Sequence, residues 1–155
     1  MTAIDYIENS EILDLFMRYK RDLFKDENIS LTSSVASIND IIQARKTVRE
    51  VYMDERIEKY ILDIVFATRD PKENNLPGLA DLISYGGSPR ASINLALAAK
   101  AYAYLQRRGY VIPEDIRAIC KDVLRHRIGL TYEAQAENIS AEDIIDKILN
   151  TVKVP

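Results

Sequence analysis

The sequence has very few of the residues that most metal sites and hydrolase active sites use, cysteine and histidine above all. Its 155 residues contain one cysteine, Cys120, and one histidine, His126, so no internal disulfide can form. Two such residues six positions apart make a poor pair for zinc, and we expect no metal site. The histidine lies among arginines with no nucleophile paired to it, so we expect no catalytic triad.

Phosphate-binding and membrane signals are missing as well. A nucleotide hydrolase of the phosphate-loop type needs G-x-x-x-x-G-K-[S/T], which does not occur, so this chain alone is not expected to be an enzyme. No basic leader and no run of 18 apolar residues occurs, which predicts no signal peptide, no membrane span and a cytoplasmic location. The net charge of -3 argues against general nucleic-acid binding.

What the sequence does contain is helical periodicity. Apolar residues make up 47% and charged residues 29%, an ordinary globular composition. Apolar spacing, capping residues and prolines predict an all-α fold of about six helices, at residues 9–25, 37–51, 54–69, 89–106, 113–125 and 140–152. A polar stretch separates an N-terminal helical arm, residues 1–30, from a helical domain, residues 31–155.

The helix over about 89–106 is predicted to be the centre of this domain. Ser88 is a good N-cap, and Pro89 suits the first helical position because its missing N–H would have no intrahelical partner. Alanine and leucine dominate the helix, which predicts burial on most sides. No alternating run is long enough for a sheet, although residues 130–132 suit a minor strand contact.

Arg90 is the unusual residue of this helix. A cation in the first turn opposes the helix dipole, which makes sense if the helix start faces an anion such as phosphate. Gly86 and Gly87 would let a ligand or a neighbouring backbone come close. The alternative is an ordinary turn followed by a solvated arginine.

The densest cationic stretch is residues 125–127, at the predicted end of a helix. Cations there complement the negative end of the helix dipole, and a grip on an acidic partner or a phosphate is the second interpretation. Glu114 and Asp115 are interpreted as acids that stabilise a helix N-terminus, without a catalytic role.

Several stretches together resemble the C-terminal lid of MoxR-type AAA+ ATPases. The likeness is carried by Tyr85-Gly86-Gly87-Ser88-Pro89-Arg90-Ala91-Ser92, Gly109 to Ile116, Val123 to Ile128, Val51 to Asp54, Ala67 to Arg69 and Val152 to Pro155. Residues 4–13 resemble the last part of such an ATPase core. The phosphate loop, the Mg-binding acidic motif and the first sensor of the family are absent.

The resemblance implies a function that the residues alone do not. It makes Arg90 the second sensor, a catalytic arginine that reaches the γ-phosphate of ATP, and places Ser88, Pro89 and Arg90 at the nucleotide. It implies ATP and Mg as cofactors of a parent protein, whose ATPase core is the first partner of this lid. It further implies lid motion on hydrolysis, a homo-oligomeric ring, chaperone-like remodelling and partners with von Willebrand factor A domains.

Two other functions remain open from the sequence. The long central helix followed by residues 111–116 also suits a histone-like or DNA-binding helical dimerisation module. A helical adaptor that binds only other proteins is the third.

Overall fold

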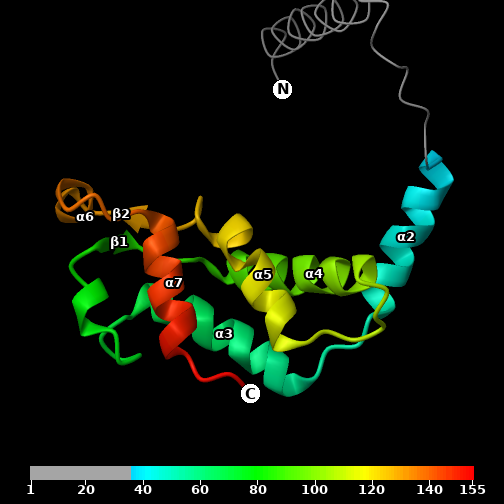
Figure 1. The fold of residues 1–155 in the computed structure, drawn as a ribbon, viewed down its shortest axis with the longest axis horizontal. Helices are drawn as coiled ribbons and strands as arrows, with labels where there is room; N and C mark the ends of the chain where they lie inside the picture. The colour runs from blue at the N-terminus through cyan, green and yellow to red at the C-terminus, as the bar shows by residue number, and fades with distance from the viewer. Residues whose placement is uncertain (1–35) are drawn as a thin grey trace, which may run out of the picture. The chain divides into compact units, whose positions relative to one another are not determined.

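The computed structural model describes residues 36–155, and residues 38–155 form one compact unit (Figure 1). Its elements are α2 (Ile38–Glu50), α3 (Glu55–Arg69), a 3-10 turn η1 (Pro77–Leu79), β1 (Ile83–Tyr85), α4 (Pro89–Leu105), α5 (Pro113–Leu124), β2 (Gly129–Leu130), α6 (Tyr132–Ala136) and α7 (Ala141–Thr151). The all-α prediction is confirmed. Within the described residues, no helix is long and apolar enough to cross a membrane.

Three of the predictions lie outside the residues that the structure describes. They are the helix over residues 9–25, the polar linker after it, and the domain boundary at residue 30.

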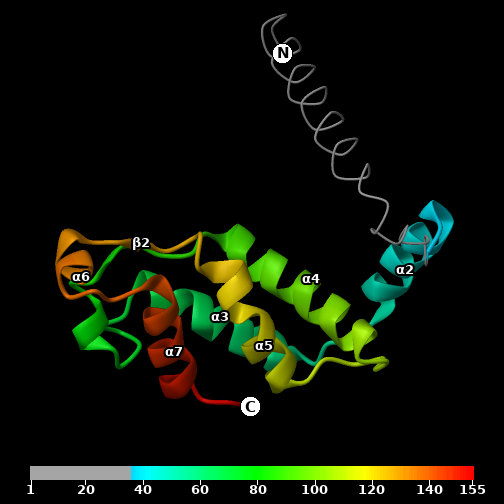
Figure 2. The same cartoon turned by 45° about the horizontal axis from the view of Figure 1, so that its top comes forward.

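The core lies where α3, α4, α5 and α7 meet. Helix α4 has its most extensive contacts with α5 and also packs on α3, while α7 packs on α5 and α3 (Figures 1 and 2). The largest completely buried aliphatic side chains come from all four helices: Ile61, Ile64, Leu95, Ile116, Leu124, Ile144, Ile145 and Ile148. The four helices therefore share one hydrophobic core.

Local sequence signals set the helix starts. The carboxylate of Asp54 accepts a hydrogen bond from the backbone N–H of Arg56 at 2.9 Å, as expected of an N-cap. Ser140 and Asp143 form a capping box at the start of α7. Pro113 occupies the first turn of α5, where its missing N–H costs no intrahelical hydrogen bond.

The prediction that the central helix is buried on most sides is wrong. Only one stripe with a spacing of four is buried: Ala91, Leu95, Ala99 and Ala103. The opposite face exposes Ile93 by 60%, Leu97 by 49% and Leu105 by 74%. Small residues let α3 and α5 approach the stripe closely, but alanine elsewhere on a helix reflects helix propensity and does not indicate burial.

A short strand pair and a short helix complete the unit. β1 and β2 pair antiparallel, with Ile83 opposite Leu130 and Tyr85 opposite Gly129. Of the minor strand contact predicted at residues 130–132, only Leu130 lies in β2, because Thr131 caps α6 and Tyr132 begins it. Helix α6 was not predicted, although Thr131 caps it by accepting a bond from the N–H of Ala134.

Candidate functional site

The candidate site is the start of α4, which β1 reaches through Gly86 and Gly87. Ser88 is the N-cap residue with an extended backbone, and Pro89 is the first helical residue, both as predicted. The hydroxyl of Ser88 makes no capping hydrogen bond, and Ser88, Pro89 and Arg90 are all exposed. The tip of the helix therefore faces solvent in the described part of the chain.

The two glycines approach the backbone of α3. A Cβ atom added to Gly86 would lie 2.3 Å from the carbonyl oxygen of Thr68, so only glycine fits there. The backbone N–H of Gly87 donates to the hydroxyl oxygen of Thr68 at 2.8 Å, and that hydroxyl donates to the carbonyl of Val65 at 2.6 Å. The sequence left open whether the glycines let a ligand or a neighbouring backbone come close. At Gly86 the structure shows a neighbouring backbone, that of Thr68.

This packing fixes the direction in which α4 begins. Thr68 is completely buried, and its single hydroxyl links the last turn of α3 to the turn that precedes α4. A buried hydroxyl with both a donor and an acceptor partner holds its neighbours in one arrangement. The tip that carries Arg90 is therefore supported by α3.

Arg90 stands in the first turn of α4 with an exposed side chain. Among residues 36–155 its guanidinium forms no ion pair, whereas Arg56, Arg108 and Arg125 each bind a carboxylate. Planar guanidinium groups bind phosphate oxygens in a two-pronged geometry, and helix N-termini favour anions. The donor set at this tip fits a phosphate group.

The cationic stretch at residues 125–127 has a mainly structural arrangement. Arg125 binds Glu142 of α7 at 3.0 Å and also contacts Asp122 of its own helix. His126 is exposed, and Arg127 is half-buried with its Nε atom lacking a partner among the described residues. Arg125 is thus engaged within the fold by ion pairs, a structural role that neither of the two interpretations named.

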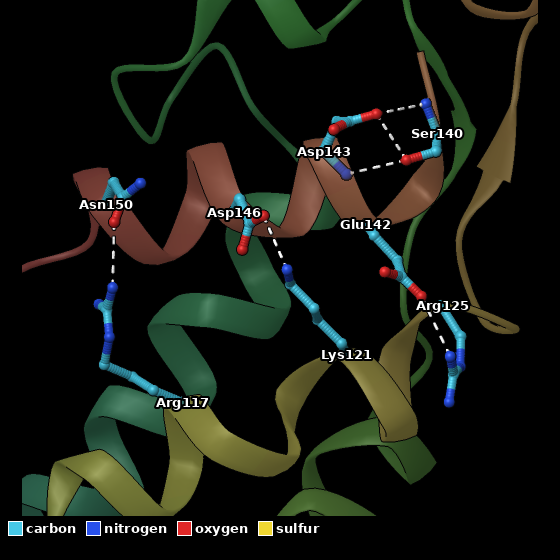
Figure 3. Close-up of polar contacts among 8 residues, drawn as sticks. All are labelled: Arg117, Lys121, Arg125, Ser140, Glu142, Asp143, Asp146 and Asn150. Carbon is cyan, nitrogen blue, oxygen red and sulfur yellow. Dashed lines mark hydrogen bonds and ion pairs between the residues drawn. The ribbon is translucent and has the colours of Figure 1, made fainter. Parts of the chain in front are cut away.

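Arg125 belongs to a row of polar contacts between α5 and α7 that the sequence did not reveal (Figure 3). The members are spaced four apart on both helices and run in opposite directions: Arg117 with Asn150 at 3.0 Å, Lys121 with Asp146 at 2.7 Å and Arg125 with Glu142 at 3.0 Å. The hydrogen bond to Asp146 raises the pKa of Lys121. The row aligns α7 along α5.

A second unforeseen contact joins the end of α4 to the start of α5. Both terminal guanidinium nitrogens of Arg108 bind the carboxylate of Asp115, one of them at 2.8 Å, and Asp115 is only 1% exposed. This carboxylate also accepts the backbone N–H of Ile112 at 2.9 Å. The bond to Asp115 raises the pKa of Arg108. Asp115 therefore has the structural role predicted for it, with a partner that sequence spacing did not indicate.

Cys120 is completely buried on α5, where it packs as a small hydrophobic residue. Burial raises the pKa of its thiol to about 12, which keeps it protonated at neutral pH. Within residues 36–155, no group of three histidine, cysteine or acidic side chains is placed to hold a metal ion.

Comparison with known proteins defines the class. Residues 79–148 match the family model of the AAA lid domain. A crystal structure of a Cytophaga hutchinsonii protein, provisionally described as an ATPase, is 44% identical with a TM-score of 0.80 and covers 85% of this chain and 40% of that one. The helical fold is thus that of an AAA lid domain.

The curated relatives narrow the class further. Chaperone MoxR1 of Mycobacterium tuberculosis is 36% identical over 121 residues, which are 78% of this chain and 32% of MoxR1. Protein MoxR of Paracoccus denitrificans is 36% identical over 105 residues, which are 64% of this chain and 31% of that protein. The chain belongs to the MoxR-type AAA+ lid domains. It spans about a third of the length of these two relatives.

Proposed function

We propose that this chain is the lid of a MoxR-type AAA+ ATPase and that Arg90 is its second sensor. The observation that carries the proposal is the exposed guanidinium of Arg90 at an open helix N-terminus, without a carboxylate partner among residues 36–155. Arg108, by contrast, is held within the fold by Asp115. Arg90 is available to an external anion instead.

In this proposal the triphosphate is bound by the ATPase core of a longer parent protein, together with Mg. The nucleotide supplies the phosphoryl group that is transferred to water. Arg90 would bind an oxygen of the γ-phosphate, where negative charge spreads as the bond to the leaving group breaks. Ser88 and Pro89 would shape the approach, since Ser88 keeps a free hydroxyl and Pro89 presents no N–H.

The start of α4 is attached to α3, and this attachment suggests how contact between Arg90 and a phosphate could move the whole lid. The bond from Gly87 to Thr68 and the close approach of Gly86 tie the tip of α4 to α3, so a pull on Arg90 would move the packed helices together. Gain and loss of the γ-phosphate would then alternate the lid between two rigid-body positions. As further parts of the proposal, the parent forms a homo-oligomeric ring, remodels other proteins as a chaperone does and uses von Willebrand factor A domain partners.

The test is a pair of equal substitutions at the two ends of α4 in the full-length parent. Arg90→Gln should lower the rate of ATP hydrolysis about 10²-fold, the effect of removing one preorganised donor from a transition state. Arg107→Gln removes an exposed guanidinium just after the other end of the helix and should leave the rate unchanged. Equal rates for Arg90→Gln and the natural enzyme would remove Arg90 from the mechanism.

A second measurement addresses the chain by itself. Titration of ATP and Mg into residues 1–155 should give negligible heat, because the sequence lacks a phosphate loop. Tight binding or turnover by this chain would contradict its assignment as a lid that depends on a separate core. The matches to lid domains favour this assignment over a DNA-binding module, and a salt-sensitive gel shift would reverse that preference.

A further inference from the structure

Helix α2 carries an apolar face that the described part of the chain leaves largely exposed. None of its residues is buried, and Ile38, Ile41 and Ile42 are exposed by 81%, 55% and 45%. Isolated helices of this length are marginal in water, and most helix stability in proteins comes from packing an apolar face. We therefore expect the apolar face of α2 to pack against a further surface in addition to α4.

The outer face of α4 continues this apolar surface. Helix α2 lies beside the C-terminal end of α4 in both views, and the Nζ atom of Lys100 donates to the carbonyl of Arg49 at 3.3 Å (Figures 1 and 2). A groove of about 360 Å³ runs between the two helices. Its apolar lining is Ile41, Ala44, Val48, Leu97, Ala101, Tyr104 and Leu105. We call this hollow the α2/α4 groove.

The rim of the α2/α4 groove is cationic. Arg45 and Arg49 line the groove itself, and Arg107 and Arg108 line a neighbouring hollow that shares Tyr104 and Leu105 with it. No acidic side chain of residues 36–155 lines either hollow. Arg108 is bound to Asp115, which leaves three arginines without ion pairs among the described residues around an apolar floor.

We propose that the α2/α4 groove binds an amphipathic α-helix of a partner protein, with acidic residues on both sides of its apolar stripe. Helices α2 and α4 cross at a steep angle (Figures 1 and 2), and apolar side chains from both can accept anchors spaced three and four residues apart on a third helix. The arginine rim selects acidic flanks by charge complementarity. Two copies of this chain joined through the same face would bring their arginine rims together, which disfavours self-association.

This proposal is separate from the function proposed for Arg90. The groove occupies the C-terminal half of α4, from Leu97 to Leu105, whereas Arg90 lies in its first turn. A lid that fails to contact nucleotide could still bind the helix, and the reverse also holds.

The experiment uses two designed helical peptides and the chain of residues 1–155. One fluorescent peptide carries leucines at positions i, i+3, i+4 and i+7 flanked by glutamates, and its twin carries lysines in place of the glutamates. Fluorescence anisotropy should show that the glutamate peptide binds at least about tenfold more tightly, and that this advantage shrinks as salt rises. The double substitution Arg45→Glu and Arg49→Glu should reverse the preference.

Single substitutions then locate the site. Leu97→Asp places a charge in the groove floor and should weaken binding of the glutamate peptide at least about tenfold. Ile93→Asp is the matched control, because Ile93 is an exposed residue of the same helix that does not line the groove. Circular dichroism should show equal helix content in both variants.

Three results would overturn the proposal. One is equal binding of the two peptides, and another is undiminished binding by the Leu97→Asp variant. The third is self-association in light scattering that Leu97→Asp removes, which would assign the α2/α4 groove to a second copy of the chain.

Discussion

Helices α2 and α7 look alike in sequence and differ in the structure. Both carry an isoleucine-rich apolar stripe opposite charged residues, yet α7 buries Ile144, Ile145, Ile148 and Leu149 while α2 buries nothing. The difference lies in their neighbours, because α7 has α3 and α5 beneath its stripe and α2 meets only part of α4. An amphipathic pattern thus shows that a helix needs a surface to pack against. It does not show whether residues 38–155 supply that surface.

The largest predicted effect separates the two helices directly. Ile148→Ala on α7 should lower the free energy of unfolding by about 2–5 kcal/mol, because it leaves a cavity in a completely buried site. Ile41→Ala on α2 should change it by less than about 0.5 kcal/mol, since Ile41 is 55% exposed. Urea unfolding followed by circular dichroism measures both, and equal losses would mean that α2 has a cover within the chain.

Polar contacts should show the same difference in stability between the buried core and the exposed helix α2. Asp115→Ala removes a buried carboxylate that both caps α5 and binds Arg108, and it should cost about 3 kcal/mol of unfolding free energy. Lys100→Met removes the exposed hydrogen bond from α4 to α2 and should cost less than about 0.5 kcal/mol. Urea unfolding measures both variants. A larger loss of unfolding free energy for Lys100→Met than for Asp115→Ala would contradict this difference between core and α2.

Two threonines give a finer comparison. Thr68→Val on α3 leaves the N–H of Gly87 buried without an acceptor and should cost about 1–3 kcal/mol. Thr47→Val on α2 removes only an exposed bond to the carbonyl of Gln43 and should cost less than about 0.5 kcal/mol. Amide hydrogen exchange at Gly87 should also accelerate in the Thr68→Val variant. Unchanged exchange there would show that the hydroxyl does not hold the start of α4.

The smallest predicted effect concerns the reactivity of the Cys120 thiol. Burial raises the pKa of the Cys120 thiol from 9.0 to about 12, so only on the order of one thiol in 10⁴ is ionised in the folded chain at pH 8. Labelling by a thiol reagent should therefore require opening of the core, and Ile148→Ala should accelerate it while Ile41→Ala does not. Rapid labelling of the natural chain at pH 8 would contradict the burial of Cys120.

The same thiol sets a direction for stability at high pH. The folded pKa lies above the unfolded one, so the unfolded chain loses the proton first as pH rises. The contribution of the buried thiol is fully present below pH 9.0 and should fall as the pH rises from 9.0 toward about 12. Urea midpoints of the natural chain and of Cys120→Ala, compared at pH 7 and pH 10, measure this dependence, and parallel shifts would contradict it.

Most helix boundaries could be read from the sequence because they depend on neighbours in the chain. Asp54, Ser140 and Pro113 act through the first turn of their own helices, so their effect needs no knowledge of the fold. Helix α6 escaped prediction because its five residues are too few to show a periodic pattern.

The sequence predicted where the candidate site lies in the chain, but not which residues surround it in the fold. The sequence placed Arg90 in the first turn of a helix, which the structure confirms. It could not show that Gly86 lies against the carbonyl of Thr68, or that Arg108 and Arg125 have carboxylate partners while Arg90 has none among residues 36–155. These facts depend on which helices pack together, and packing joins residues far apart in the chain.

The sequence by itself determined that this chain is helical, where most of its helices begin, and that Arg90 opens the longest of them, because capping and periodicity act over a few residues. Only the tertiary structure decided that α4 buries a single stripe and that α2 buries nothing. Burial depends on the surfaces that surround a helix, and the same alanine and isoleucine residues suit a core and an open groove equally well.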